Sequence, residues 1–243
     1  MLNPDRVLTI PGPNEPWHSG TLVGFDLETT GPNPHEARIV TASIVLLAPD
    51  GQIRANAEWL VNPEIDIPAE ATAVHGVTTE HARANGMDAS QGLAEIVATL
   101  TDFMHHRVPI LAYNGVYDFT VLAAELARRN MAEFSVVGVV DPYVLDKHAD
   151  TFRKGKRTLE AVTEHYGIVL ENAHTSLADS VAAVQVGQAI VANFPDRFNV
   201  PLEKLFSQQI RWKSDQAASF KQFLRRKNPQ AVISRDWPVE KLQ

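Results

Sequence analysis

Two carboxylates stand two residues apart near the start of the chain, at Asp26 and Glu28. Successive side chains of a β-strand point to opposite faces, so a strand here would place both carboxylates on one face, with Cα atoms about 7 Å apart. Burying two carboxylates among apolar neighbours destabilises the fold unless a positive partner lies between them. Divalent cations prefer oxygen ligands of this kind. A metal site is one interpretation of the pair, and a solvated strand end is the other.

Three more residues could complete such a site. Asp118 falls in the first turn of a predicted helix, where functional side chains gather in α/β folds but where the helix dipole also favours any acid. Asp179 lies inside another predicted helix, among alanine and valine, and helix propensity does not explain it there. His174 precedes that helix and, taken singly, fits an ordinary surface loop equally well.

The first half of the chain predicts a three-strand meander that would carry the first carboxylate pair. Apolar, β-rich runs cover residues 21–30, 39–48 and 53–61, and the first run ends before Gly31. The Pro-Asp-Gly sequence at residues 49–51 is a turn signal. Short β-rich runs joined in this way favour antiparallel neighbours.

The rest of the chain alternates predicted helices and strands. Apolar residues recur at helical spacing in helices predicted near 90–104 (with Ser90 as the cap), 116–129, 158–166 and 176–192, with strands at 108–112 and 134–140 between them. A meander followed by such alternation predicts an α/β fold, a mixed sheet flanked by helices.

A boundary near residues 193–199 separates this predicted domain from a C-terminal segment. Pro201 could occupy the first position of a helix, with an apolar face formed by Leu202, Leu205, Phe206, Ile210, Ala217, Phe220 and Leu224. The segment is too short to fold alone, so we expect it to dock on the main domain. The expected division is an N-terminal extension at 1–20, a main domain at 21–194 and a basic helical extension at 195–243.

Composition narrows the class of protein. The 243 residues are 44% apolar and 21% charged, which is ordinary for a globular protein. The absence of cysteine removes disulfides and thiolate metal sites from consideration. No run reaches the roughly 18 apolar residues of a membrane helix, and the N-terminus lacks a signal-peptide pattern. We therefore expect a cytoplasmic protein without a membrane partner.

Charge is distributed unevenly along the chain. The net charge of −7 argues against a broad nucleic-acid-binding surface. Residues 196–243 nevertheless hold 10 Lys and Arg against 5 Asp and Glu, a net charge of +5, which leaves −12 on residues 1–195. Residues 153–157 add a run of four cations. Such a pattern suits an acidic body that binds cations and basic elements that meet phosphates, with ordinary solvated charge as the alternative.

Four motifs in a fixed order carry a family resemblance. They are D-x-E-T-T-G at residues 26–31, H-G-V-T at 75–78, N-x-x-Y-D at 114–118 and H-x-x-x-x-D at 174–179. Over residues 21–194 the chain thereby resembles the DEDDh exonucleases, the DnaQ-like family that includes polymerase proofreading subunits, oligoribonuclease and ribonuclease T. The one departure is Ser176, where this family usually has alanine.

The resemblance implies a ribonuclease H-like fold, a mixed five-stranded sheet flanked by helices, and a 3′→5′ exonuclease activity that requires two Mg²⁺ or Mn²⁺ ions. By this analogy Asp26, Glu28 and Asp179 would hold one ion. Asp26 would bridge to the second ion and Asp118 would support it. Two ions about 4 Å apart stabilise both the attacking and the leaving oxygen of an in-line displacement. His174 would be the general base, because an imidazole with a pKa near 6.5 can accept a proton near neutral pH.

Substrate contacts follow from the same resemblance. In similar enzymes, residues around the first two motifs surround the terminal nucleotide, so the expected contacts are Leu27, Thr29, Thr30, His75, Val77 and Asn114. The expected partners are 3′ ends of single-stranded nucleic acid or short oligonucleotides, and the expected product is a nucleoside 5′-monophosphate. Discrimination between DNA and RNA depends on a 2′-hydroxyl, and no residue in the sequence decides it.

Three alternatives remain at this point. A polymerase proofreading subunit would use the same chemistry, but the C-terminal segment has the pattern of a docked helix rather than a linker, which favours a stand-alone nuclease. A catalytically silent module that binds nucleic-acid ends should lack at least one of the five site residues, and all are present. A metal-dependent phosphoesterase of small nucleotides also suits the acidic body.

Overall fold

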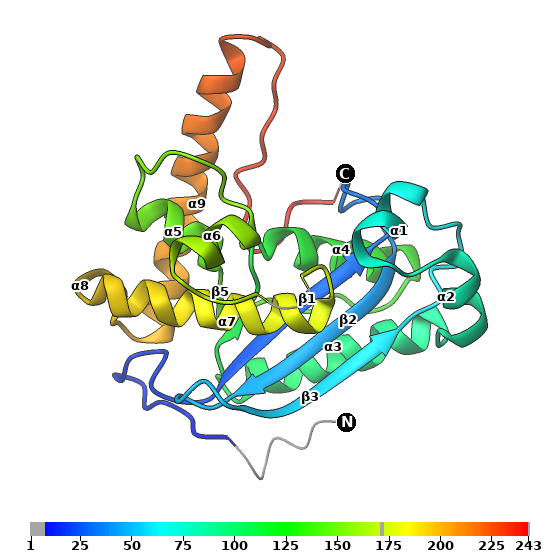
Figure 1. Ribbon diagram of the computed structural model, residues 1–243, viewed down its shortest axis with the longest axis horizontal. Helices are drawn as coiled ribbons and strands as arrows, with labels where there is room; N and C mark the ends of the chain where they lie inside the picture. The colour runs from blue at the N-terminus through cyan, green and yellow to red at the C-terminus, as the bar shows by residue number, and fades with distance from the viewer. Residues whose placement is uncertain (1–7, 171–172, 243) are drawn as a thin grey trace.

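The computed structural model describes residues 8–170 and 173–242, which fold around one five-stranded sheet (Figure 1). Its first three strands are β1 (Leu22–Thr29), β2 (Ile39–Leu47) and β3 (Ile53–Leu60), and they form the antiparallel meander that the sequence predicts. The short strands β4 (Ile110–Leu111) and β5 (Val139–Val140) extend the sheet beyond β1 in parallel orientation, so the order is β3-β2-β1-β4-β5. The predicted mixed sheet is confirmed.

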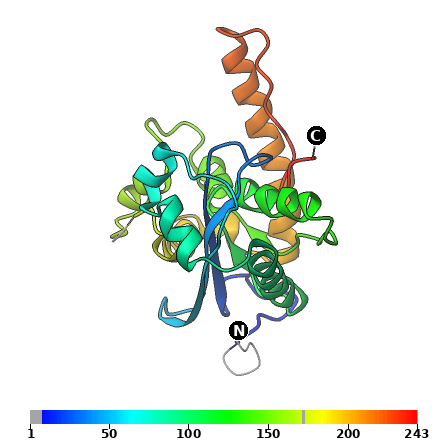
Figure 2. The same cartoon turned by 90° about the vertical axis from the view of Figure 1, so that its right-hand side faces the viewer.

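Helices cover both faces of this sheet. Those of the described residues are α1 (Ala69–His75), α2 (Thr79–Asn85), α3 (Ala89–His105), α4 (Val116–Arg128), α5 (Pro142–Ala149), α6 (Leu159–His165), α7 (Ser176–Asn193), α8 (Pro195–Phe198) and α9 (Leu202–Arg225). The apolar cores place α3 and α4 on one face and α5, α6 and α7 on the other, and Figure 2 shows the helices on either side of the sheet.

Several local expectations are corrected by the structure. The cap of α3 is Asp88 rather than Ser90, because the Asp88 carboxylate accepts the backbone N–H groups of Ser90 and Gln91. The strand predicted at 134–140 pairs only at its end, since Gly138 has φ +68 and turns the chain immediately before β5. Helices α1, α2 and α5 were not predicted.

Gly24 allows α7 to lie very close to β1. A Cβ at residue 24 would lie only 2.3 Å from the carbonyl oxygen of Ser180. The Ser180 hydroxyl donates to the carbonyl of Ser43 at 3.2 Å, and the hydroxyls of Ser43 and Ser176 are hydrogen-bonded at 2.7 Å. The first turn of α7 is thereby held against the strand that carries Asp26, and Ser176, the departure from the family pattern, has a buried polar partner.

The C-terminal segment contacts the body through the part of α9 that runs from Leu205 to Ala217. The buried residues of this helix are Leu205, Gln209 and Ala217. The Gln209 amide accepts the backbone N–H of Asp141 at 2.7 Å and donates to the Val139 carbonyl at 3.0 Å. Two hydrogen bonds from the Gln209 side chain to the backbone therefore join α9 to β5 and to the residue that follows it.

The outer half of α9 projects beyond the body, as Figures 1 and 2 show. Ile210 is 42% exposed and Phe220 is 46% exposed, so the predicted apolar face is wrong at these positions. Phe220 lies in the outer half, which the body does not cover, whereas Ile210 lies next to the buried Gln209 in the inner half and faces away from the body.

The chain after α9 returns to the body. Trp237 is buried, and its indole N–H donates to the Asp141 carboxylate at 3.4 Å. The backbone N–H of Glu240 donates to the Thr120 hydroxyl at 2.9 Å. The helical prediction for residues 195–243 did not contain this return segment. The expected division of the chain after residues 20 and 194 stays a prediction.

Across residues 8–170 and 173–242, none of the helices combines the length and apolar character needed to cross a bilayer.

Candidate active site

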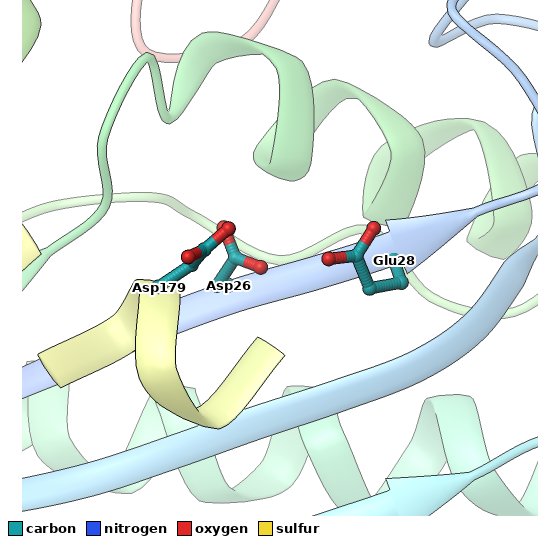
Figure 3. A group of neighbouring side chains, drawn as sticks. All are labelled: Asp26, Glu28 and Asp179. Carbon is teal, nitrogen blue, oxygen red and sulfur yellow. The ribbon is translucent and has the colours of Figure 1, made fainter. Parts of the chain in front are cut away.

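Three carboxylates meet where β1 passes the first turn of α7. Asp26 and Glu28 point to the same side of β1, and Asp179 projects toward them from α7 (Figure 3). One oxygen from each residue lies within 4.8 Å of the others, and this is the metal-ligand cluster found among the described residues. Strand alternation explains the first pair, and the close packing at Gly24 brings the third carboxylate to it.

The carboxylates raise one another's pKa values. Burial raises the pKa of Asp26 well above its ordinary value, and the charges of Asp118, Asp179 and Glu28 add to this effect. Burial and the charge of Asp179 raise the pKa of Glu28 to about 7. Desolvation and like charge both disfavour ionised carboxylates, so the cluster is electrostatically strained in the absence of a cation.

Asp118 lies next to this cluster without joining it. It stands in the first turn of α4 and is buried, and its Oδ1 accepts the backbone N–H of Leu27 at 3.1 Å. Burial raises the pKa of Asp118, while the backbone N–H groups of Asp118 and Leu27 oppose that shift. The structure therefore brings Asp118 within electrostatic reach of Asp26 but gives one of its oxygens a backbone partner.

His174 stands at the N-terminal side of α7, with an exposed side chain and φ +68. Burial raises the pKa of Asp179, and the backbone N–H and the imidazole of His174 oppose that shift. The left-handed backbone conformation is uncommon outside glycine, although histidine tolerates it better than most residues. The exposed imidazole lies close enough to Asp179 to act on its carboxylate.

The donor set fits a divalent cation. Oδ1 of Asp179 is buried and has no hydrogen-bond partner in the described structure, and an orphaned buried oxygen of this kind is costly unless a ligand satisfies it. All three clustered residues offer carboxylate oxygens, the preferred ligands of Mg²⁺ and Mn²⁺.

A pH-dependent stability follows from the pKa of Glu28. Between its ordinary value of 4.5 and about 7, the folded carboxyl keeps a proton that the unfolded chain has lost. The metal-free protein should therefore lose stability as pH rises through this window, and Mg²⁺ should stabilise it more at about pH 8 than at about pH 5.5. Thermal unfolding with EDTA or Mg²⁺ at both pH values measures this. Glu28→Gln should weaken the dependence in EDTA, whereas wild-type stability that rises with pH there would contradict the assignment.

A pocket of about 620 Å³ lies beside the carboxylates, between the end of β1 and helix α1. Four of the predicted substrate contacts line it, namely Leu27, Thr29, Thr30 and His75. The Nδ1 atom of His75 accepts the backbone N–H of Val77 at 3.1 Å, so neutral His75 carries its proton on Nε2. Nε2 is buried and makes no hydrogen bond of normal geometry, which leaves a donor for a group in the pocket. Burial lowers the pKa of His75, and the nearby backbone of Thr29 opposes that shift.

Two predicted contacts do not line this pocket. Val77 packs toward a small apolar cluster of Val40, Ile67 and Ala82. Asn114 adopts φ +58, and its backbone N–H donates to the Asp141 carboxylate at 2.9 Å. Val77 therefore orients His75, and Asn114 forms the turn that begins α4.

Tyr117 was missing from the predicted set although it lines the pocket. Its hydroxyl donates to the carbonyl of Gly31 and is hydrogen-bonded to the Thr29 hydroxyl. Burial raises the pKa of Tyr117 to about 12, so the phenol stays protonated. The residue stands within the N-x-x-Y-D motif, and its position immediately before Asp118 was a signal that could have identified it.

The residues that form this site lie in a region that matches a known protein family. The sequence profile of the exonuclease family matches residues 23–186, more than half of the chain. The chain belongs to this exonuclease family. The match spans β1 and most of α7, the two elements that supply the carboxylate cluster, and the predicted DnaQ-like, ribonuclease H-like assignment is confirmed.

Two curated relatives carry polymerase names. A DNA polymerase III subunit epsilon-like protein of Rhodobacter capsulatus is 30% identical over 171 residues, covering 68% of this chain and 23% of that protein. A PolC-type DNA polymerase III of Clostridium perfringens is 27% identical over 164 residues, covering 68% of this chain and 11% of that protein. The matched region is thus a minor part of each relative.

Solved exonuclease I structures share the fold of this chain. The Escherichia coli exonuclease I complex with a dT13 oligonucleotide has a TM-score of 0.61 at 21% identity, covering 73% of this chain and 42% of that one. Exonuclease I of Methylocaldum szegediense has a TM-score of 0.59 at 21% identity, covering 74% and 42%. The chain spans less than half the length of either protein, and the likeness concerns the fold.

Proposed function

We propose that this chain is a metal-dependent 3′→5′ exonuclease that removes terminal nucleotides from single-stranded nucleic acid as nucleoside 5′-monophosphates. The observation that carries the proposal is the carboxylate cluster of Asp26, Glu28 and Asp179, set at the pocket edge in a chain of the exonuclease family. A cytoplasmic location, expected from the sequence, is part of the same proposal.

The three clustered carboxylates would hold the divalent cations, with Asp26 shared between two ions and Asp118 supporting the second from beside the cluster. When bound, two such ions stabilise both the attacking and the leaving oxygen of the displacement. Mg²⁺ and Mn²⁺ both suit an all-carboxylate set.

The residues of the chain then supply positioning and proton transfer. A water oxygen attacks the terminal phosphorus, the bond from phosphorus to the 3′ oxygen of the preceding nucleotide breaks, and the shortened strand retains a 3′-hydroxyl. His174, exposed beside Asp179, would take the proton from the attacking water. Its solvent exposure suits exchange of that proton with water.

The pocket would hold the terminal nucleotide. Its apolar and hydroxyl lining offers van der Waals contact from Leu27 and hydrogen bonds from Thr29 and Thr30. The buried Nε2–H of His75 would donate to an acceptor on the sugar or base, which gives an unpartnered donor a role. The volume of about 620 Å³ is sufficient for a nucleotide.

The substrate class is supported by the exonuclease I structures that contain dT13 and dA16 oligonucleotides, which are single-stranded DNA bound by those proteins. Digestion of 5′-labelled single-stranded DNA and RNA with Mg²⁺, Mn²⁺ or EDTA tests the proposal. We expect a metal-dependent ladder that shortens from the 3′ end, and the faster sugar type will define the preferred substrate. Tight binding of the strands without cleavage would instead identify an end-binding module, and cleavage of small nucleotide esters alone would identify a phosphoesterase.

A proofreading subunit is the second candidate, because both curated relatives carry DNA polymerase III names. The described C-terminal residues dock on the body through α9 and the buried Trp237, so these residues do not themselves form a flexible polymerase-binding extension. Size-exclusion chromatography of the chain mixed with the polymerase III catalytic subunit of its own organism separates the two. Co-elution would favour the proofreading role, and separate elution would favour the stand-alone enzyme.

A further inference from the structure

A second hollow lies away from the carboxylates, between α5 and the outer half of α9. We call it the α5–α9 groove. Its volume is about 510 Å³, similar to that of the nucleotide pocket. Lys147 and His148 line it from α5, and Trp212, Phe220 and Phe223 line it from α9. None of these residues belongs to the site described above.

Aromatic rings are unusually accessible along this groove. Phe220 and Phe223 are 46% and 56% exposed, and their rings lie parallel with centroids 6.4 Å apart. Deeper in the groove, His148 stacks on Trp212 at 4.0 Å. Phe152, next to the lining residue Thr151, is 92% exposed. Exposed apolar groups gathered on one surface indicate a binding site rather than a random surface.

The loop at 153–157, which contributes Arg157 to the groove lining, is basic, whereas Asp215 adds one acidic group to that lining. In the 153–157 run, Arg153 and Arg157 both bind the buried carboxylate of Asp146, so they shape the loop and are not free cations. Lys154 and Lys156 are exposed and have no ion pair in the described part of the chain. The loop therefore presents two free ammonium groups beside the two paired guanidinium groups.

Short chain connections link the groove to the edge of the sheet at which the carboxylates lie. Strands β1, β4 and β5 are parallel, so their C-terminal ends lie along one edge, and α5 begins directly after β5. Tyr113 follows β4 and contacts the Tyr143 ring of α5 at 5.8 Å between centroids. Lys147 and Lys213 place their ammonium groups 4.9 and 5.9 Å from the centre of the Tyr143 ring. Aromatic rings and cations thus alternate from the strand edge into the groove.

We propose that the α5–α9 groove binds the single strand upstream of the terminal nucleotide, with bases stacked on the Phe220–Phe223 pair and phosphates near Lys154 and Lys156. The inference rests on the proposed exonuclease function and adds where the strand runs. Alternating aromatic and basic groups are the chemistry that recognises single-stranded nucleic acid. The opposite charges of the acidic body and the basic C-terminal segment, −12 and +5, favour a polyanion on this side.

Substrate length separates the groove from the active site. The double variant Phe220→Ala/Phe223→Ala should raise KM for a single strand of about 20 nucleotides by about tenfold or more, because stacking of two bases is lost. Cleavage of a dinucleotide, which cannot reach the groove, should change less than about twofold. Lys154→Gln/Lys156→Gln should weaken binding of the long strand and lower its salt dependence by up to about two charges.

Matched controls lie elsewhere on the surface. Ile53→Ala removes a side chain of similar exposure, 54%, from the opposite edge strand, and Lys204→Gln removes an exposed cation from the first turn of α9. Both should leave KM unchanged. Thermal midpoints of all variants, measured in parallel, establish that each remains folded.

The outcomes are distinguishable. Equal losses on the long strand and the dinucleotide, or no loss on either, would overturn the groove proposal while leaving the exonuclease intact. A wild-type protein that cleaves neither substrate would overturn the proposed function, and fluorescence anisotropy of the labelled long strand would then still test the groove by binding. A dimer in sedimentation that the Phe220→Ala/Phe223→Ala variant dissociates, with unchanged strand binding, would assign the groove to a second copy of the chain and overturn the proposal.

Discussion

Asp26→Asn should lose nearly all exonuclease turnover while making the metal-free protein more stable. Asp26 is surrounded by the charges of Asp118, Asp179 and Glu28, which together with burial raise its pKa. Asparagine has almost the same shape but carries no charge, so the shared metal site loses its central ligand. We expect turnover to fall on the order of 10³-fold or more, because several kcal/mol of transition-state stabilisation depends on the ions.

The same substitution removes like-charge repulsion in EDTA. The midpoint of thermal unfolding should rise by about 2–6 °C, the amount expected when a domain of this size gains roughly 1–2 kcal/mol. Gel-resolved digestion and thermal unfolding in EDTA measure the two effects. Opposite signs for activity and stability identify a functional carboxylate, because a purely structural residue would lower both.

Asp66→Asn is a suitable control for this experiment. Asp66 is exposed and forms a surface ion pair with Arg83, away from the cluster, and exposed pairs of this type contribute little. Neither turnover nor stability should change by much. Turnover of Asp26→Asn within about tenfold of the wild type would refute the metal role of Asp26.

His174→Ala should reduce turnover by about 10²- to 10⁴-fold while leaving metal affinity nearly unchanged, which is the range expected when a general base is removed. The backbone N–H of His174, which acts on the Asp179 carboxylate, survives the substitution. The side chain is exposed, so its removal leaves no cavity. Single-turnover digestion measures the chemical step, and Mn²⁺ titration followed by calorimetry measures the metal site.

The φ of +68 at residue 174 requires a second variant. Alanine is disfavoured in the left-handed region, whereas asparagine tolerates it. Equal losses in His174→Ala and His174→Asn would therefore assign the effect to the imidazole, and recovery in His174→Asn would assign it to loop geometry and contradict the general-base role. His81→Ala, which removes an exposed histidine from α2, should behave as wild type.

Much of the fold was predictable from the sequence because its signals are local. The alternation in β1 and the Pro-Asp-Gly turn at residues 49–51 predicted the meander and its antiparallel pairing. Strand alternation also predicted that Asp26 and Glu28 share a face, as Figure 3 shows. The helix predicted at 158–166 corresponds to α6, and Gly167, with φ +70, follows it in the sequence.

Contacts between distant segments were not predictable in the same way. The exposed outer half of α9 differs from the predicted apolar stripe because burial depends on where the body ends. The four cations at 153–157 looked equivalent, yet Arg153 and Arg157 both pair with Asp146, which lies in a helix that the sequence did not reveal. Likewise, Val77 lies outside the pocket because α1 and the turn after it direct that side chain toward an apolar cluster.

The sequence by itself determined which residues could do chemistry, since the types, spacing and order of the four motifs identify the exonuclease family without any coordinates. Only the tertiary structure decided how they meet. The approach of α7 to Gly24 brings Asp179 to Asp26, and the backbone N–H of Leu27 occupies one oxygen of Asp118. The α5–α9 groove likewise exists only because segments some 70 residues apart pack together, as in the hydrogen bond from Gln216 to Val144. Local patterns encode local geometry, whereas a site assembled across the sheet depends on packing distances that no single segment contains.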